Sequence, residues 1–315
     1  MPTERERLWQ LCGAPGPLPE AVEEGVWYLS LMLGAAAWFA GLLLMGVTVV
    51  IWNPNGVGDF TALALIWGLA GLLALHFGAG GFLAQLGLCL LMAGECAAVI
   101  ALGIRFDAAE PTLLASALLF AGVASVAARP AAQILNVLSA AVAGVLWLRW
   151  SLLGAPWEDV RPALLPALGV WLLCWGPLLA ALVLIVIHEA RWMATRAAGL
   201  LRAVITALIV VLAVATPLTQ PFAGLFMRDS DGSRDWMALW PLLSLCAAGI
   251  ATAVAWQQRQ RILLALCGAG LLIHVAHFYY ALGVSLIAKS LVMLLMGVGL
   301  LGLARMWGPE PGASR

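Results

Sequence analysis

The segment GFLAQLGLCLLMAGECAAVIALGI, residues 81–104, carries one charged side chain, Glu95, in an otherwise uncharged and largely apolar run. An α-helix needs about 20 apolar residues to cross the hydrocarbon core of a bilayer, so this segment is long enough to span it. Comparable apolar runs follow one another from Trp27 almost to the C-terminal end of the sequence. The pattern predicts an all-α integral membrane protein that lies in a lipid bilayer.

The composition agrees with that class. Hydrophobic residues make up 63% of the 315 residues and charged residues 10%, whereas soluble domains are about 45–50% apolar and about 25% charged. The formal net charge is zero, which argues against nucleic acid as a partner, because phosphate backbones are bound by basic surfaces. The cysteines show no CxxC spacing, so they predict neither a disulfide framework nor a zinc site.

The apolar runs divide the chain into about ten transmembrane helices. We expect a cytoplasmic N-terminal helical segment over 1–26, a polytopic bundle over 27–305 and a cytoplasmic tail over 306–315. Two of the runs, 60–77 and 112–128, lie at the lower length limit for spanning, so each is either a full span or a re-entrant segment. The expected segments are 27–52, 60–77, 81–104, 112–128, 131–150, 162–188, 200–218, 236–256, 261–282 and 284–304.

Two features test this count. Tryptophan is enriched at the water–lipid boundary, and most tryptophans lie near a segment end; the exceptions are Trp38, Trp67, Trp171 and Trp175. With ten spans, most arginines fall on the side of the two termini, and fewer, Arg149 among them, fall on the other side. Basic residues accumulate on the cytoplasmic side, so both termini are predicted to be cytoplasmic. Two inverted five-helix halves, a plan used by many transporters, also fit the count.

Ionisable groups inside a span need a physical reason to be there, because each costs at least about 2.5–3.5 kcal/mol to insert. Glu95 lies about nine residues, or about 13 Å, from the end of its segment, too deep to reach water easily. It must be protonated, paired or turned toward a water-filled cavity. Lys289, the only lysine in the chain, enters from the same leaflet. It either extends to the interface or pairs with Glu95, and such a pair is either a structural contact or part of a solute or proton site.

A second polar group lies near the end of segment 261–282. His274, His277 and Tyr280 are spaced three residues apart and share one helix face. With Ser290 they either line the same outer cavity as Glu95 and Lys289, or they are hydrogen-bonded packing residues and part of an interfacial aromatic belt. Two histidines without a third ligand do not predict a metal site.

Other parts of the sequence bear on function mainly by exclusion. Gln133 and Asn136 are predicted to form helix–helix hydrogen bonds. The sequence contains no GxSxG, HExxH or Walker motif and no nucleophile with a base at recognisable spacing, so we expect neither an enzyme nor a resident cofactor.

Four short stretches resemble a known family: VWYL at 26–29, AWFA at 37–40, HFYYAL at 277–282 and LIAKS at 286–290. They are similar to a family of bacterial polytopic inner-membrane proteins called domain of unknown function 4401, which is related to family 2157. The resemblance implies a bacterial inner membrane and a small membrane-anchored partner protein that bears a Gly-Asp-Tyr motif. It implies no reaction.

Two functions fit these observations. The first is an inner-membrane protein that binds or transports a small solute or ion through a polar cavity in its outer half. The candidate site is Glu95, Lys289, His274, His277, Tyr280 and Ser290. The second is a non-transporting membrane scaffold or a subunit of a membrane complex.

Overall fold

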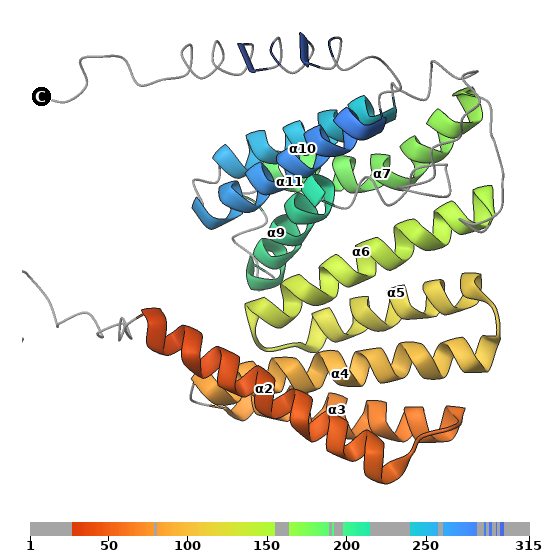
Figure 1. Ribbon diagram of the computed structural model, residues 1–315, viewed down its shortest axis with the longest axis vertical. Helices are drawn as coiled ribbons and strands as arrows, with labels where there is room; N and C mark the ends of the chain where they lie inside the picture. The colour runs from red at the N-terminus through yellow and green to blue at the C-terminus, as the bar shows by residue number, and fades with distance from the viewer. Residues whose placement is uncertain are drawn as a thin grey trace, which may run out of the picture. The chain divides into compact units, whose positions relative to one another are not determined.

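A computed structural model describes most of the predicted bundle (Figure 1). The described residues are 27–78, 81–154, 164–188, 191, 198–214, 240–257, 261–281 and a few isolated positions after 281. All regular structure in these ranges is helical, with no strand. The predicted N-terminal helical segment, 1–26, and the predicted tail, 306–315, lie outside them.

Nine helices occupy the described residues, and each coincides with one predicted segment. They are α2 (Trp27–Trp52), α3 (Val57–Phe77), α4 (Gly81–Phe106), α5 (Ala109–Val126), α6 (Pro130–Leu153), α7 (Leu164–Ile187), α9 (Ala198–Val214), α10 (Trp240–Gln257) and α11 (Arg261–Ala281). The ends differ from the predicted ones by a few residues. The tenth predicted segment, 284–304, is described only at isolated positions.

Six of the described helices, α2 to α7, are long and apolar enough to cross a membrane. The apolar stretches in α9, α10 and α11 are shorter, so the predicted count of about ten spans is supported for six. The two segments of marginal length form uninterrupted helices of 21 residues in α3 and 18 residues in α5. At 1.5 Å per residue these are about 32 and about 27 Å long, close to the core thickness of about 30 Å. Neither breaks and reverses as a re-entrant segment does.

The chain forms two compact units, divided between Ala101 and Leu102. In the N-terminal unit, α3 and α4 pack closely because glycines face each other. A Cβ atom built on Gly94 would collide with the backbone nitrogen of Gly68 and lie 2.9 Å from the carbonyl oxygen of Ala64. A Cβ atom on Gly71 would collide with the backbone of Leu91. Small residues that let two backbones approach are the usual basis of helix association in membranes.

Helix α2 packs on α4 in a similar way. The Trp38 indole Nε1 donates a hydrogen bond of 3.2 Å to Oε1 of Gln85. The thiol of Cys89 lies 3.9 Å from the carbonyl oxygen of Trp38, and a Cβ atom on Gly41 would lie 2.6 Å from the same sulfur. The polar residue Gln85 in the apolar segment therefore helps to hold α2 against α4.

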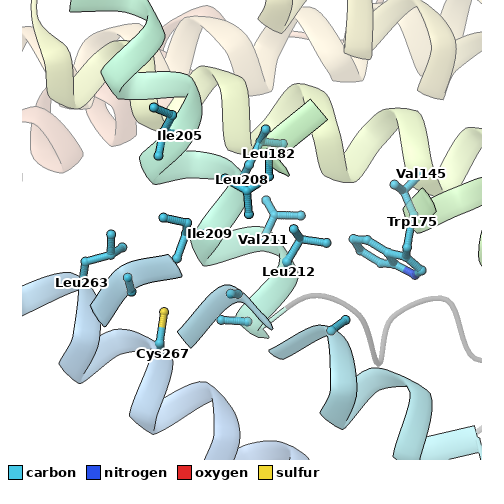
Figure 2. Packing of buried hydrophobic residues seen from close by; sticks show 14 of the residues in the cluster. Val145, Trp175, Leu182, Ile205, Leu208, Ile209, Val211, Leu212, Leu263 and Cys267 are labelled. Atoms are coloured by element: carbon cyan, nitrogen blue, oxygen red, sulfur yellow. The ribbon is translucent and has the colours of Figure 1, made fainter. Parts of the chain in front are cut away.

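The C-terminal unit is built around α9, which contacts α6, α7, α10 and α11. Eight of its 17 residues are buried, and a helix buried on most sides belongs to the interior of a bundle. Figure 2 shows Ile205, Ile209 and Leu212 of α9 among side chains of the neighbouring helices. Helix α9 is surrounded by four other helices, and its short length agrees with this central position.

Several tryptophans inside segments are buried, and two at helix ends are exposed. Trp67, Trp171 and Trp175, which lie well inside segments, are 7%, 5% and 1% exposed. Trp52 and Trp256, which lie at helix ends, are 41% and 62% exposed. An indole inside a span is used for packing, whereas one at an end is placed where its N–H can reach water.

Candidate functional site

The candidate site residues do not all belong to one unit. Glu95 lies on α4 in the N-terminal unit, whereas His274, His277 and Tyr280 lie on α11 in the C-terminal unit. Lys289 is outside the described residues, so its pairing with Glu95 stays a prediction. Ser290 is exposed at one of the isolated described positions.

Glu95 is buried near the middle of α4. Its side chain is 8% exposed, and most residues from Gly87 to Ala97 are also buried. The helix extends to Phe106, so Glu95 lies about 16 Å from that end and about 21 Å from the other. The preceding residue, Gly94, holds the backbone of α4 against α3. The sequence thus places the carboxyl group in the apolar segment, and the packing keeps it away from the lipid surface.

Its neighbour Cys96 lies on a different face of the helix and is exposed. Successive residues of an α-helix are separated by about 100°, so two adjacent side chains occupy different faces. The contrast between the two residues shows that burial of Glu95 follows from the orientation of α4.

His274 joins α11 to the end of α9. It is 1% exposed, and its Nε2 lies 2.8 Å from the carbonyl oxygen of Ala213. Ala213 precedes the last residue of α9, where helix carbonyls have no partner within the helix. An Nε2–H of His274 donates to this carbonyl and so satisfies it. Gly270, one turn earlier on α11, allows the approach, because a Cβ atom there would lie 2.5 Å from the same oxygen.

This geometry fits the packing interpretation of His274, and the cavity-lining interpretation stays a prediction. His277 and Tyr280 continue along the uninterrupted helix α11, so the predicted spacing along one face is kept. Their side chains lie outside the described part of the structure, and their role stays a prediction.

A second group of buried polar side chains, on α6 and α7, was not predicted from the sequence. Arg149 was assigned to the side of the membrane opposite the two termini, and that placement stays a prediction; the residue lies in α6 and is only 3% exposed. Its Nη1 is 3.5 Å from the carbonyl oxygen of Gly154, just after the helix. On α7, the thiol of Cys174 lies 3.9 Å from the carbonyl oxygen of Val145, which is one turn before Arg149 on α6. A signal was present in the sequence, since Arg149 follows Val145 by four residues and shares its helix face.

The indole of Trp171 belongs to the same helix face as Cys174. Trp171 is 5% exposed, and its Nε1 is buried with no hydrogen-bond partner among the described residues. A buried indole N–H usually has a hydrogen-bond acceptor. The described residues around Trp171 provide none.

The two amides of α6 differ from the prediction in part. Gln133 donates from Nε2 to the carbonyl oxygen of Ala127 over 2.9 Å; Ala127 is the residue after α5, so this bond ties α6 to the connection that precedes it. Asn136 donates from Nδ2 to Ala132 of its own helix, so the described hydrogen bond of this buried side chain is within α6. Asn136 lies one turn beyond Ala132, and that carbonyl is within reach of its short side chain.

Within the described residues, no three His, Cys, Asp or Glu side chains come together in a way that could hold a metal ion. Comparison with known proteins adds no relative: no family model, no curated protein and no solved structure matches the chain. The resemblance to domain of unknown function 4401 therefore stays a prediction from the residues that carry it.

Proposed function

We propose that this chain is a multi-pass protein of a bacterial inner membrane that binds or transports a small solute or ion, with Glu95 as its intramembrane ionisable group. The observation that carries the proposal is the burial of this carboxyl group, 8% exposed, in the middle of a 26-residue apolar helix. Ionisable residues inside transmembrane helices are rare, and they mark ion, proton or substrate pathways.

The chemistry of a carboxyl group sets what it can do there. In a low-dielectric interior the ionised form is stable only beside a cation, a hydrogen-bond donor or water, and otherwise the group takes up a proton. Glu95 can thus exchange a proton for a cation or for a cationic group of a solute. The resemblance to bacterial inner-membrane proteins supports the location, and the predicted polar residues Lys289, His277 and Tyr280 are the further groups proposed for the cavity.

A proton is the first ion to test, because every carboxyl group can carry one. The purified full chain is reconstituted in vesicles of phosphatidylethanolamine and phosphatidylglycerol that contain a pH-sensitive dye. A potassium diffusion potential set with valinomycin drives the flux. We expect flux above that of protein-free vesicles, and we expect Glu95→Gln to abolish the excess because the amide cannot ionise. Cys96→Ala, the adjacent residue on the exposed face, is the matched control and should retain the flux.

Labelling with dicyclohexylcarbodiimide, which reacts with protonated carboxyl groups in apolar surroundings, gives a second readout by mass spectrometry. We expect modification of Glu95 and protection by a permeant cation or solute that uses the site. Equal flux per molecule from the wild type and Glu95→Gln would contradict the proposal, as would wild-type vesicles indistinguishable from protein-free ones.

The second candidate is a membrane scaffold or complex subunit. The described geometry of His274 favours it, because this histidine donates to the end of α9 and so serves packing. For a scaffold, Glu95→Gln lowers the amount of protein in the membrane and of any co-purifying small membrane-anchored partner, while the flux of wild-type vesicles stays at the protein-free level.

A further inference from the structure

Helix α7 contains a proline well inside its length. The helix runs from Leu164 to Ile187, and Pro177 lies within it, followed by ten further helical residues. Proline has no backbone N–H, so the carbonyl oxygen of Leu173, four residues earlier, loses the partner that an α-helix normally gives it. The proline ring also presses against this carbonyl group, which bends the helix axis. The backbone of α7 is therefore weakened at one point between its two ends.

The residue before the proline removes a second restraint. A side chain at that position crowds the proline ring and disfavours the helical conformation, and this residue is Gly176. A Cβ atom built on Gly176 would have no atom within 4 Å among the described residues, so close packing against another helix does not account for the glycine. Pro177 itself is exposed. The described neighbours therefore leave room for α7 to change its angle at this point.

The parts of α7 before and after Pro177 are held differently. Before it, the thiol of Cys174 lies 3.9 Å from the carbonyl oxygen of Val145 on α6. After it, Leu182 is fully buried in the cluster that includes residues of α9, and Figure 2 shows it near Leu208 of that helix. Beyond Leu182 the helix is less enclosed, and Ile187 at its end is 69% exposed. The C-terminal part of α7 is thus free of the contact that holds the N-terminal part on α6.

We infer that Gly176-Pro177 is a hinge at which the C-terminal part of α7 changes its angle while the N-terminal part stays on α6. Hinges are short stretches, often with small residues, that absorb a change in backbone dihedral angles. Ile187 lies about 15 Å beyond Pro177 along the helix axis, so a change of about 20° at the hinge moves it by about 5 Å. Such a movement changes the access to an intramembrane site. This use of the hinge rests on the proposed function, whereas the hinge itself does not.

The test measures distances between pairs of spin labels by double electron–electron resonance, with the full chain in lipid nanodiscs. The labels are attached to a genetically encoded ketone amino acid, so the native cysteines remain. Two pairs report on the C-terminal part of α7, namely Ile187 with Val126 of α5 and Ile187 with Trp256 of α10, so that movement is seen along two directions. A third pair, Leu172 with Val126, reports on the N-terminal part. All four labelled positions are exposed.

We expect at least one Ile187 pair of the wild type to give a distance distribution broader than that of the Leu172 pair, by up to about 5 Å. Pro177→Ala restores the N–H that bonds the Leu173 carbonyl, so it should narrow the Ile187 distributions to the width of the Leu172 pair. Gly169→Ala is the matched control. Gly169 lies on the same helix, no atom lies within 4 Å of the position its Cβ would take, and the next residue is not proline. This variant should leave all three distributions unchanged.

Two results would overturn the hinge. One is a wild type whose Ile187 pairs are both as narrow as the Leu172 pair, because α7 would then be held at a single angle. The other is Pro177→Ala leaving the Ile187 distributions as broad as in the wild type, because the movement would then not arise at the proline. The distances are measured without any flux. Wild-type vesicles that show no flux would therefore contradict the proposed function and leave the result on the hinge as it stands.

Discussion

Replacing Gly94 by Ala tests whether close contact between α3 and α4 holds the N-terminal unit together. The added Cβ atom would lie 2.7 Å from Cα of Gly68 and 2.9 Å from the carbonyl oxygen of Ala64, whereas ordinary contact begins near 3.4 Å. The backbone nitrogen of Gly68 would be closer still, so the overlap is at least about 0.7 Å, and all three neighbours are backbone atoms of α3. The helices must therefore separate by about that amount, because close-packed interiors have little free space to absorb it.

The energetic cost follows from overpacking. Inserting a carbon into a well-packed interior costs about 1–3 kcal/mol, and Ala recovers about 0.5–1 kcal/mol over Gly within a helix. We expect a net destabilisation of up to about 2.5 kcal/mol for Gly94→Ala. Gly46→Ala is the matched control, because no atom lies within 4 Å of the position its Cβ would take. That variant should be unchanged or more stable than the wild type.

The assay is thermal unfolding in detergent, followed with a thiol-reactive fluorophore. Cys89, Cys174 and Cys267 are buried and react as the bundle opens. A lower midpoint for Gly94→Ala together with an unchanged or higher one for Gly46→Ala is the expected result. If Gly94→Ala were as stable as Gly46→Ala, the close contact between the two backbones would not be a stabilising interface, and the reasoning from the glycines would be wrong.

Two further predictions use the same preparation. His274→Phe removes the donor to the Ala213 carbonyl and should cost about 1–3 kcal/mol, because it leaves a buried acceptor unsatisfied; His188→Phe, at an exposed position, should cost little, and equal midpoints for the two variants would show that the bond contributes nothing. A membrane-permeant maleimide should label Cys96, which is exposed, well before Cys89, which is buried. Mass spectrometry of the folded protein checks this order, and faster labelling of Cys89 would contradict the orientation of α4.

The positions of the helices could be predicted from sequence with good accuracy. The segment 27–52 coincides with α2 (Trp27–Trp52), and the segment 261–282 with α11 (Arg261–Ala281). Helix ends are set by local features, namely where an apolar run stops and where Gly, Pro or a charged residue interrupts it. The prediction needed no knowledge of neighbouring helices, because in a membrane each span satisfies its own backbone hydrogen bonds.

The candidate site was predictable only in part. The apolar surroundings of Glu95 in the sequence implied that it would avoid lipid, and its side chain is buried. For His274 both a cavity and a packing role were open, and its observed hydrogen bond is to Ala213, 61 residues away. For Arg149 the sequence predicted only the side of the membrane, and its burial depends on neighbouring helices, because a position four residues from a helix end is compatible with either water or a neighbouring helix.

Hydropathy along the chain was enough to predict a helical chain apolar enough for a membrane, the bounds of its described helices to within a few residues, and the polar side chains that lie inside them. Which of those side chains are enclosed, and what they contact, emerged from the packing of the helices: Glu95 is buried on α4, His274 contacts the end of α9, and Arg149 is buried on α6. The physical reason is that backbone hydrogen bonding and hydropathy act over one or two turns of chain, whereas the surroundings of a side chain depend on helices far away in sequence.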